Sequence, residues 1–309
     1  MRILILGAGG IGGYYGARMQ AAGGDVTFLV RPGRAAQLKK DGLHVDSPFG
    51  NLVLPAQVLT QAEISSPYDV VFVSCKAYDL ESAIAAIAPA VGPETAIIPL
   101  LNGIRHIDVL VDRFGPERVL GGVALISVAL AADGTVQHLN KLHKIVIGSR
   151  VSQESRHLAP LAELLGACGV DFTLSGNVVQ AMWDKVVFLA TLAGSTCLMR
   201  ASVGDIMHTL AGESFVRTLF AECAAIAAVS GQALSDAQQG AYLATLTDPA
   251  SGLMASMLRD VERGGPTEAD HILGDLVQRA QTLGVPTPLL ALAYSHLQAY
   301  DRRRQTATH

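Results

Sequence analysis

Glycines recur at a fixed spacing close to the start of the chain. Gly7, Gly9 and Gly12 follow an apolar run at Ile3–Leu6 and open a helical pattern that continues to about Ala22. In a strand–turn–helix setting, the first glycine permits a tight turn, the second lets backbone approach a pyrophosphate, and the third lets the helix lie close to the strand. The helix N–H groups then face the anion, so the pattern predicts a dinucleotide site, against the alternative of a tight turn without a ligand. The predicted binding segment consists of Gly7, Ala8, Gly9, Gly10, Ile11 and Gly12.

An arginine stands where a site specific for NAD would have Asp or Glu. The second strand is predicted at Asp25–Val30, and Arg31 follows it directly. A guanidinium suits a 2′-phosphate, which it binds through charge-assisted hydrogen bonds. Arg31 and the nearby Arg34 therefore favour NADP as the cofactor, and the alternative is a solvated pair of surface arginines.

Polar residues also stand at the ends of the next two predicted strands. Lys76 follows the run Asp69–Ser74, and Asn102 follows Ala96–Leu101. Because the carboxyl ends of parallel strands line the ligand crevice, Lys76 is predicted to meet cofactor phosphate or ribose. The amide of Asn102 can donate and accept, as a nicotinamide or a substrate hydroxyl requires. The alternatives are a solvated lysine and an ordinary Asn-Gly turn.

The elements that would position these residues change in type along the chain. Strands and helices alternate first, with a hairpin pattern at Leu43–Thr60 and β-like runs expected at the edge of the sheet. From Asn177 onward the pattern is helical. We therefore predict an α/β domain over residues 1–175 and a helical domain over 176–309, with the active site in the cleft between them. The three edge runs are Val119–Leu130, Thr135–Leu139 and Lys144–Ile147. The helices expected in the second domain are Val178–Met199, Glu213–Ser230, Ala237–Leu246, Leu253–Arg263, Glu268–Leu283 and Pro288–Asp301.

Composition narrows the class of protein. The chain has 309 residues, of which 50% are hydrophobic and 16% charged, and its net charge of −4 does not indicate nucleic acid or an anionic membrane as a partner. The apolar run Val186–Met199 is too short and too interrupted to span a bilayer. The four cysteines lie far apart, as in a reduced cytoplasmic protein. The nine histidines include no HExxH pattern, so we expect no metal site.

In their order along the chain, the motifs resemble the ketopantoate reductase (2-dehydropantoate 2-reductase) family. The resemblance covers nearly the whole chain and implies an N-terminal Rossmann-type doubly wound sheet followed by an all-α domain similar to that of 6-phosphogluconate dehydrogenase. It also implies NADPH-dependent reduction of a 2-oxo acid, as in the step from ketopantoate to pantoate in pantothenate biosynthesis. The motifs are the glycine fingerprint, Lys76-Ala77, Asn102-Gly103, Trp183-x-Lys185, Ser256-Met257-x-x-Asp260, and Thr267-Glu268-x-Asp270 with Gly274 beyond it.

The same resemblance implies a role for each site residue. Lys185, which taken alone reads as a lysine at the wet end of an apolar helix, would be the general acid that protonates the carbonyl oxygen. Glu268, otherwise a first-turn acid, would hold the lysine or the substrate hydroxyl and contact the cofactor. Ser256 would bind the substrate carboxylate, and Lys76 and Asn102 would line the cofactor side.

The chain departs from the family where the substrate's polar groups would bind. Asparagines are expected one and two turns after the lysine, but Leu189 and Ala193 stand there, and Val203 and Leu253 replace two more. A hydroxyl buried without a partner costs about 1–3 kcal/mol, so we expect a more apolar 2-oxo acid or poor ketopantoate reduction. Partial compensation by the hydroxyls of Thr191, Ser195 and Thr196 stays open.

Two other functions remain as alternatives. An opine or β-hydroxy acid dehydrogenase would keep the fold and change the reaction, although the Thr267-Glu268-x-Asp270 segment argues against it. A non-catalytic NADP-sensing protein would bind the nucleotide without turnover, although retention of Lys185, Ser256 and Glu268 argues against a decayed site. The alanine-rich helices are compatible with a homodimer.

Overall fold

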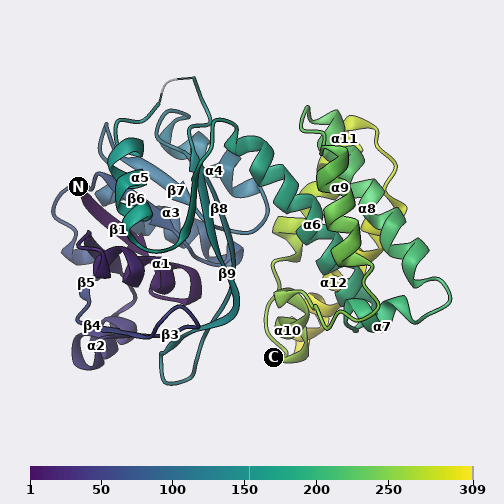
Figure 1. Cartoon of the computed structure of the whole chain (residues 1–309), viewed down its shortest axis with the longest axis horizontal. Coiled ribbons are helices and arrows are strands. Elements are labelled where there is room, and N and C mark those ends of the chain that lie inside the picture. Colours follow the sequence, from purple (N-terminus) through teal and green to yellow (C-terminus); the bar gives the residue numbers. More distant parts are fainter. Residues whose placement is uncertain (153, 308–309) are drawn as a thin grey trace. The chain divides into compact units, whose positions relative to one another are not determined.

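The computed structural model describes residues 1–152 and 154–307, and the chain divides into two compact units (Figure 1). Unit 1 contains Met1–Leu101 and His106–Val178. Unit 2 contains Asn102–Arg105 and the chain from Val179 onward. The domain boundary proposed after residue 175 lies close to this division. The segment Asn102–Arg105 follows a strand of unit 1 but packs with unit 2, which the sequence does not reveal.

The first sheet of unit 1 is parallel, and β1 lies at its centre. Ile3 of β1 pairs with Val26 on one side and with Val70 on the other, and the Ile3 side chain is fully buried. Such continuous burial explains why these strands are apolar runs rather than alternating patterns. The order is that of a Rossmann-type α/β domain, as the sequence predicts. In spatial order the strands are β5 (Gln57–Leu59), β2 (Asp25–Leu29), β1 (Arg2–Leu6), β6 (Val70–Val73) and β7 (Ala96–Pro99).

Unit 1 contains a second sheet, so the expectation that its strands extend the edge of the first sheet is wrong. The hairpin pattern is confirmed, since Leu43 pairs with Leu54. The later runs, however, pair with one another and with that hairpin, and one isolated bridge from Ile97 to Val119 connects them to the first sheet. The second sheet contains β10 (Asp171–Leu174), β9 (Val136–Gly148), β3 (Leu43–Asp46) and β4 (Leu52–Leu54), with β8 (Gly121–Leu130) paired to β9.

The first helix, α1 (Gly10–Ala21), contacts both sheets. A Cβ on Gly16 would lie 2.5 Å from Phe28 in the first sheet, whereas one on Gly13 would lie 2.7 Å from Val136 in the second. The hydroxyl of Tyr15 donates to the carbonyl oxygen of Lys144 at 2.9 Å. A helix buried on opposite sides needs small or apolar residues all round, which explains its composition.

Four further helices belong mainly to unit 1, and one of them was not predicted. The missed helix, α4, follows Gly103, and its Ile107 and Leu110 are buried at helical spacing. The helices are α2 (Pro32–Asp41), α3 (Leu80–Ile87), α4 (Arg105–Phe114) and α5 (Leu158–Ala167), with short 3₁₀ turns η1 (Gln61–Glu63), η2 (Ala77–Asp79) and η3 (Ala88–Ala90). The sequence predicts a helix from about residue 153 to Cys168, of which residue 153 lies outside the described residues and α5 forms the later part.

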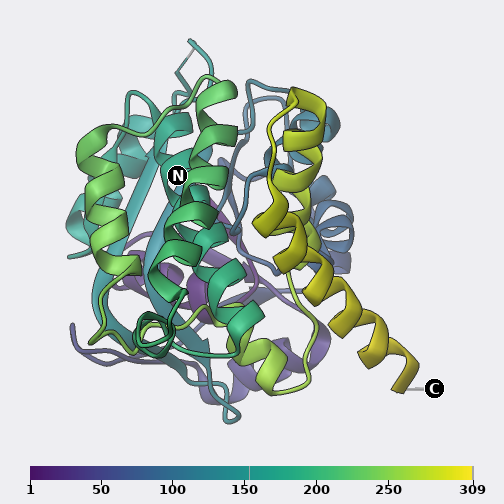
Figure 2. The ribbon, with the colours of Figure 1, turned by 90° about the vertical axis from the view of Figure 1, so that its right-hand side faces the viewer.

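In the described part of unit 2 every regular element is a helix, as predicted, and the last of them runs to Ala307 (Figure 2). The expected helix over Glu268–Leu283 is wrong in one respect: its first part is a π-helix. A short helix, α7, was missed, and α12 continues past the expected end at Asp301. The elements are α6 (Val178–Met199), α7 (Val203–Met207), α8 (Gly212–Val229), α9 (Asp236–Leu246), α10 (Ser256–Glu262), η4 (Asp270–Gly274, the π-helix), α11 (Asp275–Leu283) and α12 (Pro288–Ala307).

The helix α6 has the predicted bounds, Val178–Met199, and so extends the apolar run Val186–Met199 by eight residues at its start. By length and composition alone, its 22 residues would suffice to cross a membrane, which the run by itself would not. Within the unit, however, 67% of its most apolar window is buried. Burial of this kind is what a core helix of a globular unit shows.

Candidate active site

The loop Gly7–Gly12 follows β1 and is the segment for which a phosphate contact is predicted. Gly7 has a φ of +90°, a conformation that side chains other than glycine rarely adopt, and its N–H donates to the carbonyl oxygen of Leu29. A Cβ on Gly12 would lie 2.2 Å from the Gly7 carbonyl oxygen, so this position requires glycine. A Cβ on Gly9 would meet nothing within 4 Å, which leaves the backbone open to a close ligand. These features fit the pyrophosphate of a dinucleotide.

Tertiary contacts explain two other residues of the loop Gly7–Gly12, and the sequence does not show these contacts. A Cβ on Gly10 would lie 3.0 Å from Val128 of β8, so the second sheet restricts this position. Ala8 is 3% exposed, and its carbonyl oxygen accepts a hydrogen bond from Arg34 Nη2 at 3.0 Å. The same nitrogen donates to the carbonyl oxygen of Gly134, and Arg34 Nη1 donates to Gln37 Oε1. Arg34 therefore connects the loop Gly7–Gly12 to the β8–β9 turn, a structural role that the sequence does not reveal.

Arg31 directly precedes α2, at the end of β2, and its side chain is 79% exposed. Its Nη2 lies 3.0 Å from Oδ1 of Asp79, with which it forms an ion pair. Asp79 was not predicted as part of the site. The signal in the sequence that could have identified Asp79 was its position three residues after Lys76, where the structure has the short helix η2.

Lys76 and Asn102 lie at strand ends as the sequence predicts, but in different units. Lys76 is half-buried and precedes the short helix η2 in unit 1. Asn102 is half-buried in unit 2, and the next residue, Gly103, has a φ of +82°. A Cβ on Gly103 would lie 2.8 Å from the ring of His271 in η4, so glycine permits close packing there. The loop that carries Asn102 is thus fixed on the π-helix.

The same π-helix follows Glu268. The Glu268 carbonyl oxygen accepts from the N–H groups of His271 and Ile272, each at 3.1 Å, and its side chain is buried. Thr267 is anchored to α12, where its hydroxyl donates to Asp301. Burial lowers the pKa of His271 to about 4, so this ring is neutral at pH 7. Short π-helical segments occur frequently at functional sites.

Lys185 lies on α6, and its surroundings perturb its acidity. Burial lowers the pKa of Lys185 from 10.5 to about 8, while the carboxylate of Glu268 acts in the opposite direction. The structure thus brings together the two residues that the sequence predicts for proton transfer. Trp183, two residues earlier, is 5% exposed and its ring lies 5.9 Å from the guanidinium carbon of Arg279. That packing holds the first turns of α6 in place.

The proposed substrate residues lie on other parts of unit 2. Ser256 is exposed and is the first residue of α10. Of the positions where the family's asparagines were expected, Ala193 and Val203 are buried, whereas Leu189 and Leu253 are partly exposed. The backbone N–H of Val203 donates to the carbonyl oxygen of Leu253 at 3.0 Å, so these two apolar residues lie together.

The hydroxyls considered as replacements for the asparagines are used inside the helix. Thr191, Ser195 and Thr196 are at most 1% exposed. Each donates to a backbone carbonyl oxygen three or four residues earlier in α6. Compensation by these groups is therefore not supported, because each hydroxyl proton is already committed to the helix backbone.

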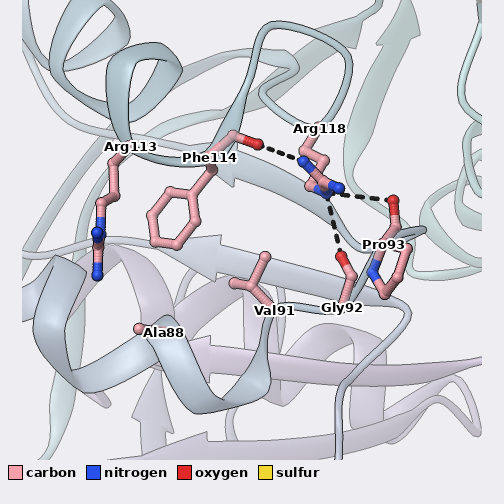
Figure 3. Close-up of a pocket in the computed structure, with 7 residues that line it drawn as sticks. All are labelled: Ala88, Val91, Gly92, Pro93, Arg113, Phe114 and Arg118. Atoms are coloured by element: carbon pink, nitrogen blue, oxygen red, sulfur yellow. Dashed lines mark hydrogen bonds between the residues drawn. The ribbon is translucent and has the colours of Figure 1, made fainter.

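A hollow of about 340 Å³ in unit 1 contains none of the predicted site residues (Figure 3). Arg118 donates to the carbonyl oxygens of Gly92, Pro93 and Phe114 at 2.6–3.1 Å. These bonds satisfy loop and helix carbonyls, which is a structural role. Among residues 1–152 and 154–307, no group of three or more His, Cys, Asp or Glu side chains is arranged to hold a metal ion. The hollow is lined by Ala88, Val91, Gly92, Pro93, Arg113, Phe114 and Arg118.

Family models and known proteins match the chain over both units. Residues 3–151 match the family model described as ketopantoate reductase PanE/ApbA, and residues 177–301 match its C-terminal model. The chain is 36% identical over 304 residues to "Uncharacterized oxidoreductase YkpB" of Bacillus subtilis (strain 168), covering 98% of this chain and all of that protein. It is 25% identical over 312 residues to a 2-dehydropantoate 2-reductase of Nostoc sp. (strain PCC 7120 / SAG 25.82 / UTEX 2576), covering 98% and 96% of the two chains.

Solved structures resemble this chain over nearly its whole length. A 2-dehydropantoate 2-reductase from Geobacter metallireducens GS-15 is 29% identical, with a TM-score of 0.88 over 97% of this chain and 99% of that one. A D-mandelate dehydrogenase solved with NADH and anilino(oxo)acetate has a TM-score of 0.89 at 22% identity, covering 99% of both chains. At that identity the second likeness shows the fold alone.

Proposed function

The chain belongs to the ketopantoate reductase PanE/ApbA family, and from this premise we propose that it reduces a 2-oxo acid to a 2-hydroxy acid with NADPH. The observation that carries the proposal is the pairing of Lys185 with Glu268. A lysine with a pKa near 8 is still charged at pH 7 and gives up its proton more readily than an ordinary lysine. Perturbation by burial together with a specific charged partner is typical of catalytic groups.

The proposed site takes its phosphate contacts from unit 1 and further cofactor contacts from both units. The loop Gly7–Gly12 would bind the pyrophosphate, and Arg31 would bind the 2′-phosphate. Lys76, Asn102 and Glu268 are proposed to contact the rest of the cofactor. When bound, a reduced nicotinamide supplies a hydride to the carbonyl carbon of the substrate.

Side chains of the protein are proposed to stabilise the developing charge and to donate the proton. As the carbonyl carbon is reduced, negative charge develops on its oxygen, and the Lys185 ammonium Nζ stabilises that charge and donates a proton. Glu268 keeps the ammonium charged beforehand, because its carboxylate opposes the effect of burial. The Ser256 hydroxyl is proposed to bind the substrate carboxylate, with Asn102 beside the reacting groups. Contributions of general acids are typically about 10²–10⁴-fold in rate.

Replacement of Lys185 tests the assignment. We expect Lys185→Ala to lower kcat by at least about 10²-fold while NADPH affinity stays nearly the same, because Lys185 acts on the transition state. Turnover close to that of the unsubstituted enzyme would remove Lys185 from its role. Binding of NADPH without its oxidation, over a broad panel of 2-oxo acids, would instead favour the NADP-sensing function.

For the substrate, we propose a 2-oxo acid with an apolar tail in preference to ketopantoate. Leu189, Ala193, Val203 and Leu253 offer no side-chain hydrogen bond, and the neighbouring hydroxyls of α6 are committed to backbone. A buried substrate hydroxyl would lose about 1–3 kcal/mol. Comparison of kcat/KM for ketopantoate and 2-oxoisovalerate tests this, and a strong preference for ketopantoate would support the alternative, a role in pantothenate biosynthesis.

Two further expectations remain proposals. The cytoplasm is the proposed location, and a homodimer is the proposed assembly beyond the small-molecule substrate. Size-exclusion chromatography with light scattering measures the assembly, and fractionation of cells that express the tagged full chain measures the location.

A further inference from the structure

Arg31, the residue proposed to recognise the 2′-phosphate, already has an acidic partner. Its Nη2 lies 3.0 Å from Asp79 Oδ1. Both side chains reach solvent, with 79% of Arg31 and 36% of Asp79 exposed. An exposed pair of this kind contributes little to folding, so its significance lies in what it does to the charge of Arg31.

The topology of the first sheet places the pair beside the phosphate loop. Strand β1 lies between β2 and β6, and all three run parallel. The segments that follow their carboxyl ends therefore emerge at one edge of the sheet: Arg31 after β2, Gly7–Gly12 after β1, and Asp79 after β6. The ion pair thus joins the two segments that flank the loop proposed to bind the cofactor phosphates.

A carboxylate at this position opposes a second negative charge on Arg31. A phosphate monoester carries about −1.5 to −2 charges at pH 7, so a 2′-phosphate bound to Arg31 would be repelled by Asp79. NADH has a hydroxyl instead, which carries no charge and can donate to a carboxylate. The two cofactors therefore differ in what Asp79 does to each.

We propose that Asp79 competes with the 2′-phosphate for Arg31. By this competition it lowers the ratio of NADPH affinity to NADH affinity and so helps to set the cofactor preference. The inference rests on the proposed function, because it assumes that Arg31 binds this phosphate. Asp79 is a specificity residue here and takes no part in proton transfer.

Removal of one charge tests the inference without a substrate. Asp79→Asn preserves the shape of the side chain, and Asp79 makes no side-chain cap of α3, so the fold should be unaffected. Affinities for NADPH and NADH are measured by isothermal titration calorimetry at low salt. We expect the ratio of NADPH to NADH affinity to rise by about five- to tenfold in Asp79→Asn. The gain should shrink as salt is added, because both partners are exposed.

Two controls separate competition at Arg31 from a general change in charge. Glu94→Gln removes another exposed carboxylate of unit 1, which pairs with Arg156 at 3.5 Å, and should leave the ratio unchanged. In an Arg31→Gln background, Asp79→Asn should also have no effect on the ratio. An unchanged or lower ratio in Asp79→Asn, or a rise that persists without Arg31, overturns the inference and leaves the proposed function standing. Failure of the unsubstituted protein to bind either nucleotide overturns both.

Discussion

Replacement of Glu268 by Gln should move the pH dependence of the proposed reduction to lower pH. Burial lowers the pKa of Lys185 to about 8 against the opposing effect of Glu268. Glu268→Gln removes the effect that raises this pKa and leaves the burial, so the pKa of Lys185 must fall below about 8. Because a general acid works in its protonated form, activity is present below the pKa and lost as the pH rises through it.

The size of the effect follows from the fraction of charged lysine. With a pKa of about 8, about nine-tenths of Lys185 is protonated at pH 7 and about one-tenth at pH 9. The unsubstituted enzyme should therefore lose about tenfold in kcat/KM for each pH unit well above 8. The ratio of its activity to that of Glu268→Gln should grow between pH 6 and pH 8. Simple loss of a contact would lower activity equally at every pH.

The assay follows NADPH absorbance with a 2-oxo acid from pH 6 to pH 10. A matched control is Glu222→Gln, since Glu222 is also a buried glutamate of unit 2 but accepts hydrogen bonds from the backbone N–H groups of Leu289 and Leu290. This control should lower stability and leave the alkaline limb in place. An alkaline limb that stays at the same pH in Glu268→Gln, or no limb near pH 8 in the unsubstituted enzyme, would refute the reasoning.

Three further predictions concern the loop Gly7–Gly12, the substrate preference and the pH dependence of stability. Gly12→Ala should destabilise the fold and abolish NADPH binding because its Cβ would meet the Gly7 carbonyl oxygen, whereas Gly9→Ala should fold normally and bind NADPH more weakly; thermal unfolding and calorimetry distinguish them. Leu189→Asn should raise kcat/KM for ketopantoate relative to 2-oxoisovalerate by on the order of tenfold. Between about pH 8 and pH 10.5, the free energy of unfolding should rise with pH by on the order of 3 kcal/mol more in the unsubstituted protein than in Lys185→Met. In this pH range Lys185 holds a proton in the unfolded chain but has lost it in the native protein. Trp183 fluorescence follows unfolding, and a parallel pH dependence in the two proteins would contradict the prediction.

Much of the fold could be predicted because its signals are local. The run Ile3–Leu6 and the glycines after it specify strand, turn and helix through neighbouring residues alone. The bounds of α6 were predicted correctly for the same reason, since one helical period continues from Val178 to Met199. The second sheet was misplaced because pairing between strands such as β3 and β9 joins distant segments, and alternation along a strand does not name its partner.

The candidate site likewise has residues that the sequence predicts and properties that it does not show. Family motifs pointed to Lys185 and Glu268, but neither the burial that lowers the pKa of Lys185 nor the π-helix after Glu268 is visible in the sequence. Asp79 was missed because it lies 48 residues from Arg31 along the chain. An ion pair of that separation forms through the order of the strands, not through any local pattern.

The sequence by itself determined the glycine loop Gly7–Gly12, the alternation of strands and helices, and the types of residue proposed for proton transfer, because these depend on the order of neighbouring residues. Tertiary structure alone decided the second sheet around α1, the attachment of Asn102 to unit 2, and the charge environments of Lys185 and Arg31. The physical reason is that burial and charge interactions act through space. They depend on which distant segments are brought together, and both determine how readily a side chain gives up a proton or binds an anion.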